Sequence, residues 1–146
     1  MVSLSFVLCT ALPCTASLGM EHRLIKDAQI TASSEYDSNH AAIQARLNFK
    51  AGKGKQGAWS AGSNDANQWI QVALGSFTNL TGIATQGRNG YVNQWVTKYQ
   101  LQYSDDGINF EYYKAPGQSL PKVKPYPSDR QFPIVARIHG TRLTAN

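Results

Sequence analysis

Residues 97–113 read TKYQLQYSDDGINFEYY, and this stretch decides the fold class. Its first half alternates strictly, which in an extended chain places two sets of side chains on opposite faces: Tyr99, Leu101 and Tyr103 on one, and Lys98, Gln100 and Gln102 on the other. An Asp-Gly pair follows, and then a second short run rich in aromatic residues. Because glycine readily adopts positive φ, this pattern predicts a β-hairpin.

Short runs with the character of strands also lie on both sides of the hairpin. We predict strands at residues 29–33, 69–74, 80–86 and 134–138, the second of them ending at Gly75. No long segment has the apolar spacing of an amphipathic helix. Several short strands without helices predict an all-β protein, an antiparallel β-sandwich or barrel. The connections are long and polar, and in a rigid β-scaffold such loops commonly carry recognition.

Length and composition limit the chain to one folded domain without obvious catalytic chemistry. It has 146 residues, of which 42% are hydrophobic and 16% charged, well outside the range of disordered chains. No apolar run approaches the roughly 20 residues of a membrane span. With 3 His and 2 Cys, a zinc or iron–sulfur centre is not expected. We find no Ser-His-Asp spacing and no phosphate-binding loop, so we predict no enzyme activity and no cofactor.

The net charge of +5 is confined to the C-terminal part of the chain. Residues 1–112 contain eight Lys and Arg and eight Asp and Glu, whereas residues 113–146 contain six basic residues and one acid, Asp129. The basic residues are dispersed and form no run. This pattern argues against a nucleic-acid partner.

The N-terminus is expected to direct secretion. Residues 1–11 resemble a short signal peptide, with cleavage after Ala11 or after Ala16. The second cut would also remove Cys14. The sequon Asn79-Leu80-Thr81 fits a glycosylated extracellular protein. The alternatives are that the N-terminal segment is a first strand or that the sequence comes from a truncated gene model.

Several motifs, taken in order, have the character of one family. They are LGME at 18–21, IKDAQITASS at 25–34, ARLN at 45–48, AW at 58–59, NDANQWIQV at 64–72, TGIATQGR at 81–88, QWVTKY at 94–99 and YSDDG at 103–107. Together they resemble the discoidin domain, the type C domain of coagulation factors V and VIII. The resemblance implies a jelly-roll-like, galactose-binding-domain-like sandwich of about eight antiparallel strands. It also implies a secreted, non-catalytic adhesion module that binds glycans, collagen, anionic phospholipid or growth factors through loops at one end.

The resemblance weakens toward the C-terminus. We place the discoidin-type domain at residues 14–146, with 113–146 divergent and shortened, and we expect the family's last strand to be lacking. The resemblance also implies that Cys14 normally bonds a terminal cysteine, which has no counterpart here. An alternative hypothesis follows: a truncated or vestigial discoidin fragment without independent ligand binding, or a dimer linked through Cys14.

The resemblance points to three loops as the ligand site, at residues 35–40, 61–66 and 88–93. The candidate residues are Tyr36, Asp37, Asn39, His40, Asn64, Arg88 and Tyr91. An aromatic ring beside hydroxyl and amide groups suits a sugar or a peptide side chain. The polar tip at 37–39 argues against insertion into a membrane. We therefore predict a cell-surface or matrix glycan, or a collagen-like matrix protein, as the ligand.

Each candidate also has a plainer interpretation. Tyr36 could pack the base of its loop, His40 could be a solvated surface residue, and Arg88 could tie loops together by hydrogen bonds. Two isolated acids, Asp37 and Asp65, are too few for a Ca²⁺ site. The remaining expectations are that three tryptophans fill the core and that three lysines form a flexible basic loop with an option to contact an anionic glycan: Trp59, Trp69 and Trp95, and Lys50, Lys53 and Lys55.

Overall fold

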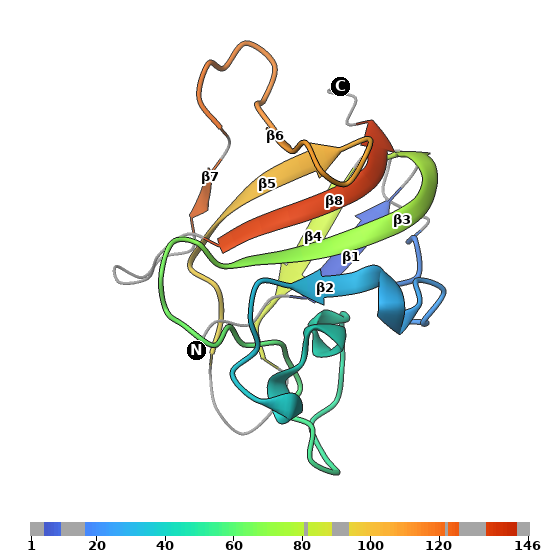
Figure 1. Cartoon of the computed structure of the whole chain (residues 1–146), viewed down its shortest axis with the longest axis vertical. Coiled ribbons are helices and arrows are strands. Elements are labelled where there is room, and N and C mark those ends of the chain that lie inside the picture. Colours follow the sequence, from blue (N-terminus) through green and yellow to red (C-terminus); the bar gives the residue numbers. More distant parts are fainter. Residues whose placement is uncertain are drawn as a thin grey trace.

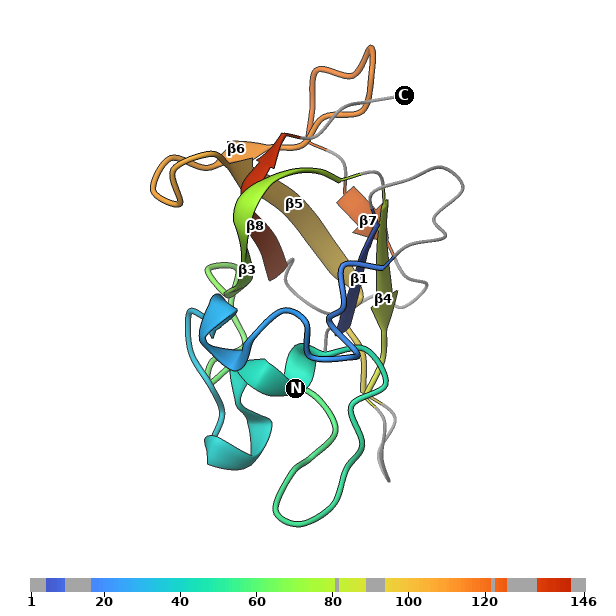
Figure 2. The same cartoon turned by 90° about the vertical axis from the view of Figure 1, so that its right-hand side faces the viewer.

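The fold consists of two packed β-layers (Figures 1 and 2). The computed structural model describes residues 5–9, 17–80, 82–88, 94–121, 123–125 and 134–142. The larger sheet has the order β2 (Ile30–Ala32), β3 (Trp69–Asn79), β8 (Ile134–Arg142), β5 (Lys98–Ser104) and β6 (Glu111–Tyr112), and β7 (Val123–Pro125) also pairs with β5. The smaller sheet pairs β1 (Ser5–Cys9) with β4 (Gly82–Gln86). The predicted all-β sandwich is confirmed.

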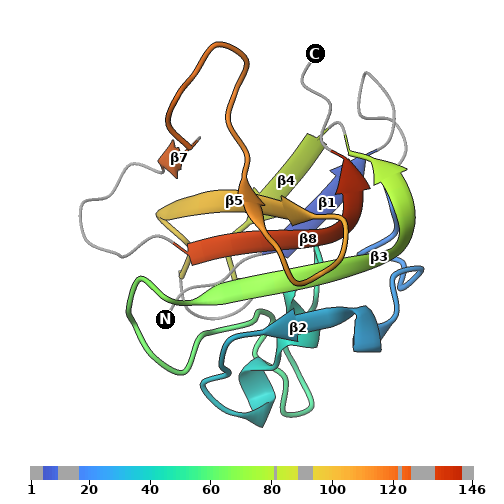
Figure 3. The same ribbon diagram turned by 45° about the horizontal axis from the view of Figure 1, so that its top comes forward.

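Strand β8 departs from the expected antiparallel arrangement. It lies between β3 and β5 and runs parallel to both, with Val135 opposite Trp69 on one side and Gln100 on the other (Figure 3). The other pairs in the described residues are antiparallel. A tight hairpin forces antiparallel pairing, but a long connection leaves the direction free. Strand β8 enters the sheet after long connections from both of its neighbours, so the local pattern of residues 134–138 did not reveal its direction.

Strand β3 does not end at Gly75, as the sequence predicted. It continues to Asn79, and its register with β8 shifts between Ala73 and Thr78. Gly75 lies within this irregularity at φ 77°, a conformation that favours glycine. The glycine therefore marks a bulge inside a long strand, which is the second common meaning of glycine in a strand pattern.

The predicted hairpin at 97–113 is confirmed, but both faces of its first strand are covered. Tyr99 and Leu101 pack against the core, as expected. On the opposite face Gln102 and Ser104 are also buried. Ser104 Oγ donates to Asp106 Oδ1 at 2.9 Å and accepts from the Gly107 N–H, so the turn itself covers this end of the strand. The N–H groups of Asn109 and Ile108 also bond Asp106 and hold the pKa of its carboxyl well below the usual range.

The core lies between the sheets and the long segment that connects β2 to β3. Its largest fully buried apolar members come from the sheet, from that segment and from the chain before β2: Ile70 and Val72, Trp59, and Met20. That segment contains two short 3-10 helices, η2 (Ser38–His40) and η3 (Ala42–Ala45), and a third, η1 (Asp27–Gln29), precedes β2. Among the described residues no helix is long and apolar enough to cross a membrane.

A buried ion pair fastens the segment around η3 to the segment before β2. The Arg46 side chain is 2% exposed, and its Nη2 donates to Asp27 Oδ1 at 2.5 Å. Its Nη1 donates to the Met20 carbonyl oxygen at 2.8 Å. Asp27 is half-exposed and also pairs with Arg23 at 3.6 Å on the surface. Arg46 is therefore a structural residue whose buried positive charge is paired with Asp27.

Residues 5–9 form strand β1 and pair with β4 along its length, with Ser5 opposite Gln86 and Cys9 opposite Gly82. The register places Leu8 opposite Ile83, and the Ile83 side chain packs against the core. In the described part of the chain β1 is the only strand paired with β4. Residues 5–9 of the segment expected to act as a signal peptide thus form a strand of the smaller sheet.

Proline substitutions at neighbouring positions of β1 are expected to have unequal effects. Successive N–H groups of a strand point to opposite edges, and β4 lies along one edge of β1, so only one of Phe6→Pro and Val7→Pro removes a hydrogen bond to β4. In the full chain produced without secretion, hydrogen exchange at residues 82–86 should accelerate about tenfold in one variant and change little in the other. Unchanged exchange in both variants would contradict the pairing.

Candidate functional site

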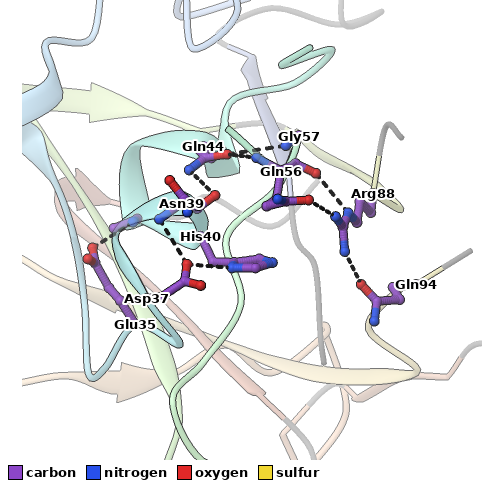
Figure 4. A network of polar contacts seen from close by, with 10 residues as sticks. Glu35, Asp37, Asn39, His40, Gln44, Gln56, Gly57, Arg88 and Gln94 are labelled. Atoms are coloured by element: carbon purple, nitrogen blue, oxygen red, sulfur yellow. Dashed lines mark hydrogen bonds and ion pairs between the residues drawn. The ribbon is translucent and has the colours of Figure 1, made fainter. Parts of the chain in front are cut away.

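Asp37 and His40 fix the shape of the first predicted loop (Figure 4). Asp37 caps η2 and accepts the Asn39 N–H at 2.8 Å. Its Oδ1 also lies 2.7 Å from His40 Nδ1, and an ionised carboxylate only accepts, so Nδ1 donates. The bond with His40 lowers the pKa of the Asp37 carboxyl. His40 is 5% exposed, so its interpretation as a solvated surface residue is wrong.

Tyr36 is partly exposed and packs against His40 of the same loop. Its side chain is 54% exposed. Its ring meets the His40 ring edge to face, with centroids 5.4 Å apart and planes at 87°. Its backbone N–H donates to the Ser60 carbonyl oxygen at 2.9 Å, which joins the loop to the segment before β3. The loop therefore presents one aromatic ring to solvent on a support of fixed groups.

Gln44 links this loop to the next segment from inside the protein. Its fully buried side chain donates from Nε2 to the Asn39 carbonyl oxygen at 2.6 Å. Its Oε1 accepts the N–H groups of Gln56 and Gly57 at 2.8 and 3.2 Å. One side chain thus bonds backbone groups of two segments, and the Gln56 N–H also bonds the Asn39 carbonyl oxygen directly.

Arg88 ties loops together, which is the plainer of the two roles considered for it. Its Nε donates to the Gln56 carbonyl oxygen at 2.7 Å, and Nη2 donates to Gln56 Oε1. Its Nη1 donates to Gln94 Oε1 at 2.6 Å, and its backbone N–H donates to the Gln94 carbonyl oxygen. Figure 4 shows the guanidinium turned toward these two glutamines. Most of its donor capacity is therefore spent inside the protein.

The second predicted loop contacts the first at its start. Gly62 N–H donates to Ser34 Oγ at 3.0 Å, and the Trp59 Nε1–H donates to the Ser34 carbonyl oxygen at 2.9 Å. Further along, Asp65 accepts from the Asn67 N–H and from Gln68 Nε2, and so shapes its own loop. Asn64 is exposed and lies outside the network of Figure 4.

These contacts bring the loop at 35–40, Gly62 of the second predicted loop and Arg88 of the third together at one end of the molecule, which we call the loop end; residues 89–93 lie outside the described residues. It comprises residues 35–40, 50–62 and Arg88, joined by the bonds described above. In Figures 1 and 2 it lies at the bottom, away from β6 at the top. Tyr91 and Cys14 lie outside the described residues. Asn79 lies at the end of β3, opposite Arg142 of β8.

Sequence reasoning missed the glutamines that organise the loop end and misplaced one tryptophan. Gln44, Gln56 and Gln94 link its segments by hydrogen bonds, and nothing in their local sequence pattern distinguished them from surface residues. Trp59 is fully buried as expected, but Trp95 is 39% exposed, so its assignment to the core is wrong. The sequence could not show this, because Trp95 comes before β5 and its exposure depends on what packs over it.

The side chains of the loop end indicate which kinds of interaction it can make. In the residues that the structure describes, no group of three or more His, Cys, Asp and Glu side chains is placed to hold a metal ion. What the loop end offers is an exposed aromatic ring, backbone held in place from inside, and polar side chains at its surface. Such a set suits hydrogen bonding and stacking.

Comparison with known proteins places this geometry in a family. The model of the F5/8 type C domain matches residues 29–142. Bovine lactadherin is 39% identical over 116 residues, which is 77% of this chain and 27% of lactadherin. Human EGF-like repeat and discoidin I-like domain-containing protein 3 is 40% identical over 119 residues, 79% of this chain and 25% of that protein. Pig coagulation factor V is 36% identical over 120 residues, 79% of this chain and 5% of its own length.

The chain thus spans about a quarter or less of the relatives it matches. The matched region includes most of residues 113–146, where the resemblance in the sequence weakens. The family match covers most of the chain, and the sandwich with its clustered loops agrees with it, so this chain belongs to the F5/8 type C, or discoidin, domain family.

Proposed function

We propose that this chain is an extracellular, non-catalytic recognition module that binds a cell-surface or matrix glycan, or a collagen-like matrix protein, through the loop end. Membership of a family of non-catalytic binding domains supports the class of function. The observation that carries the proposal is the Tyr36 ring, exposed at the loop end and backed by the His40 ring. An exposed aromatic on a rigid support loses little conformational entropy when a ligand stacks on it.

The support beneath Tyr36 is built to keep its position. Asp37 holds His40 through Nδ1, and the Tyr36 backbone is bonded to Ser60. His40 Nε2 is buried and has no hydrogen-bond partner among the described residues. The imidazole therefore serves as a packing surface for Tyr36, with its orientation set by the carboxylate.

Tyr36→Ala is expected to weaken ligand binding about tenfold or more, because aromatic anchors at the centre of a site carry much of the binding free energy. The measurement is a screen of the chain on a glycan array and on immobilised collagens, followed by titration of the ligands found. Tyr112→Ala is the matched control, since Tyr112 is also an exposed tyrosine but lies on β6. Equal binding by Tyr36→Ala and the unmodified chain would overturn the assignment of the site.

The array and the collagen surface also separate the two ligand classes. Binding on only one of them assigns the ligand to that class. The alternative of a fragment without ligand binding, or of a dimer linked through Cys14, predicts no signal on either surface and a dimer on a gel that disappears on reduction. That combination would replace the proposed function.

A further inference from the structure

A short hairpin rich in lysine projects from the loop end. Gly52 and Lys55 form a bridge, with the Gly52 N–H donating to the Lys55 carbonyl oxygen at 2.9 Å and the Lys55 N–H returning the bond at 3.0 Å. Lys53 and Gly54 make the turn between them. In Figures 1 and 2 this green-cyan loop forms the lowest projection of the molecule, next to the segment that carries η2. The flexible basic loop expected from the sequence is therefore a hydrogen-bonded hairpin.

The turn has an unusual residue at its tip. Lys53 and Gly54 both have positive φ, 49° and 75°, as in the type I′ turn of a two-residue hairpin. Asn, Asp and Gly are the usual residues at the first central position, because they tolerate this conformation best. A lysine there is held in a less favourable conformation, and the turn exposes its side chain. The backbone alone gives no reason for lysine at this position.

The lysines of the hairpin and the acidic side chains near it differ in whether a partner holds them. In the described residues Lys50, Lys53 and Lys55 form no ion pair. The nearby carboxylates are engaged within their own loops: Asp37 with His40, and Glu35 with the Ala42 N–H at 2.7 Å. The side chains of Lys50 and Lys53 thus face solvent, while the carboxylates of Asp37 and Glu35 are held by hydrogen-bond donors of their own segment.

The hairpin is joined directly to the candidate site. Gln56, which follows it, donates from its N–H to the Asn39 carbonyl oxygen at 3.0 Å and accepts from Arg88. A Cβ atom on Gly54 would lie 3.4 Å from Asn39 Oδ1, so the tip of the hairpin is close to the Tyr36 loop. The hairpin and the loop that carries Tyr36 are therefore neighbours at the loop end.

We propose that the hairpin at 50–55 is an anion-binding extension of the Tyr36 site and that the ligand is an acidic glycan, carrying sulfate or carboxylate groups. This inference rests on the proposed function, because it takes the Tyr36 site as the place where a sugar stacks. The lysines supply charge attraction and the tyrosine supplies the stacking surface. Exposed charges are screened by salt, so the binding contributed by the hairpin weakens as ionic strength rises.

The test removes charge from the hairpin without disturbing its turn. Lys53→Asn places a residue that favours positive φ at the tip, and Lys50→Gln removes a second exposed charge. The control pair is Lys98→Gln with Lys114→Gln, which removes the same charge from exposed lysines at the start of β5 and after β6. Both double variants and the unmodified chain are titrated with heparin and with hyaluronan at two salt concentrations.

We expect the hairpin variant to bind heparin, hyaluronan or both about tenfold more weakly at low salt, with a smaller difference at high salt, while the control pair changes binding little. Loss with heparin alone identifies sulfate as the recognised group, and loss with hyaluronan identifies carboxylate. Equal weakening in the two double variants would overturn the proposal, since bulk charge would then explain the binding. Absence of binding to both polymers would also overturn it.

Two further measurements separate this inference from the proposed function. Anionic phospholipid vesicles are tested with the same variants, and hairpin-dependent binding to vesicles without binding to either polymer would overturn the glycan assignment. If the unmodified chain binds a neutral glycan or collagen through Tyr36 but neither acidic polymer, the hairpin proposal fails and the proposed function stands. If Tyr36→Ala has no effect on any ligand, the proposed function itself fails.

Discussion

Trp59→Ala is expected to lower the free energy of unfolding by about 4 kcal/mol, the typical loss for a large aromatic residue removed from a core. The Trp59 side chain is fully buried, and its indole N–H donates to the Ser34 carbonyl oxygen. The substitution leaves a cavity between the segment before β3 and the sheets, and it leaves a carbonyl oxygen without its donor. Urea unfolding followed by circular dichroism measures the loss.

A second substitution keeps this prediction testable if the alanine variant does not fold. Trp59→Phe retains much of the apolar volume but loses the hydrogen bond, so we expect a loss of about 2 kcal/mol. Trp95→Ala is the matched control, because Trp95 is exposed; its loss should be less than about 1.5 kcal/mol. Similar losses for Trp59→Ala and Trp95→Ala would contradict the assignment of Trp59 to the core.

Asp27→Asn is expected to destabilise the protein by about 3 kcal/mol, because it leaves the buried Arg46 guanidinium without its counter-charge. The estimate lies at the low end for a broken buried pair, since Asp27 is 46% exposed and water can take part of its place. For a chain of this size, the loss corresponds to a fall in Tm on the order of 10 °C. Thermal unfolding at constant ionic strength measures it.

Two controls isolate the buried charge as the cause. Arg23→Ala removes only the exposed partner of Asp27 and should change stability by less than about 1 kcal/mol. Combining Asp27→Asn with Arg46→Met removes both charges, so the double variant should be more stable than the sum of the two single losses predicts. Additive losses in this cycle, or a neutral Asp27→Asn, would rule out the ion pair as a source of stability.

The strands that the sequence predicted best are those whose positions follow from residues close by in the sequence. Period-two alternation and the Asp-Gly pair located β5 and the hairpin to β6 because both signals are local. Residues 80–86 and 29–33 contain β4 and β2 with small errors at the ends. The errors concern pairing between distant strands. Strand β3 continues past Gly75 because β8 pairs with it there. Strand β8 is parallel to its neighbours, and its long connections allow either direction, so nothing local in its sequence indicates which one it takes.

The candidate site shows the same contrast between features that local sequence predicts and features that depend on distant residues. The loop at 35–40 was identified from its motif and its polar tip, and the structure brings it together with residues 56–62 and Arg88. The burial of His40 and the tying role of Arg88 were not predictable, since the first depends on packing within the fold and the second on Gln56 and Gln94 from other parts of the chain. Glutamine in a loop has no periodic signal that separates a buried organiser from a solvated residue.

The sequence by itself determined that this chain is an all-β member of the discoidin family, because alternation, turn residues and motif order are properties of neighbouring residues. Only the tertiary structure decided which groups are available to a ligand. Burial and hydrogen bonding depend on what packs across tens of residues of chain, and they turned His40 and Arg88 inward while leaving Tyr36 and the lysine hairpin at the surface.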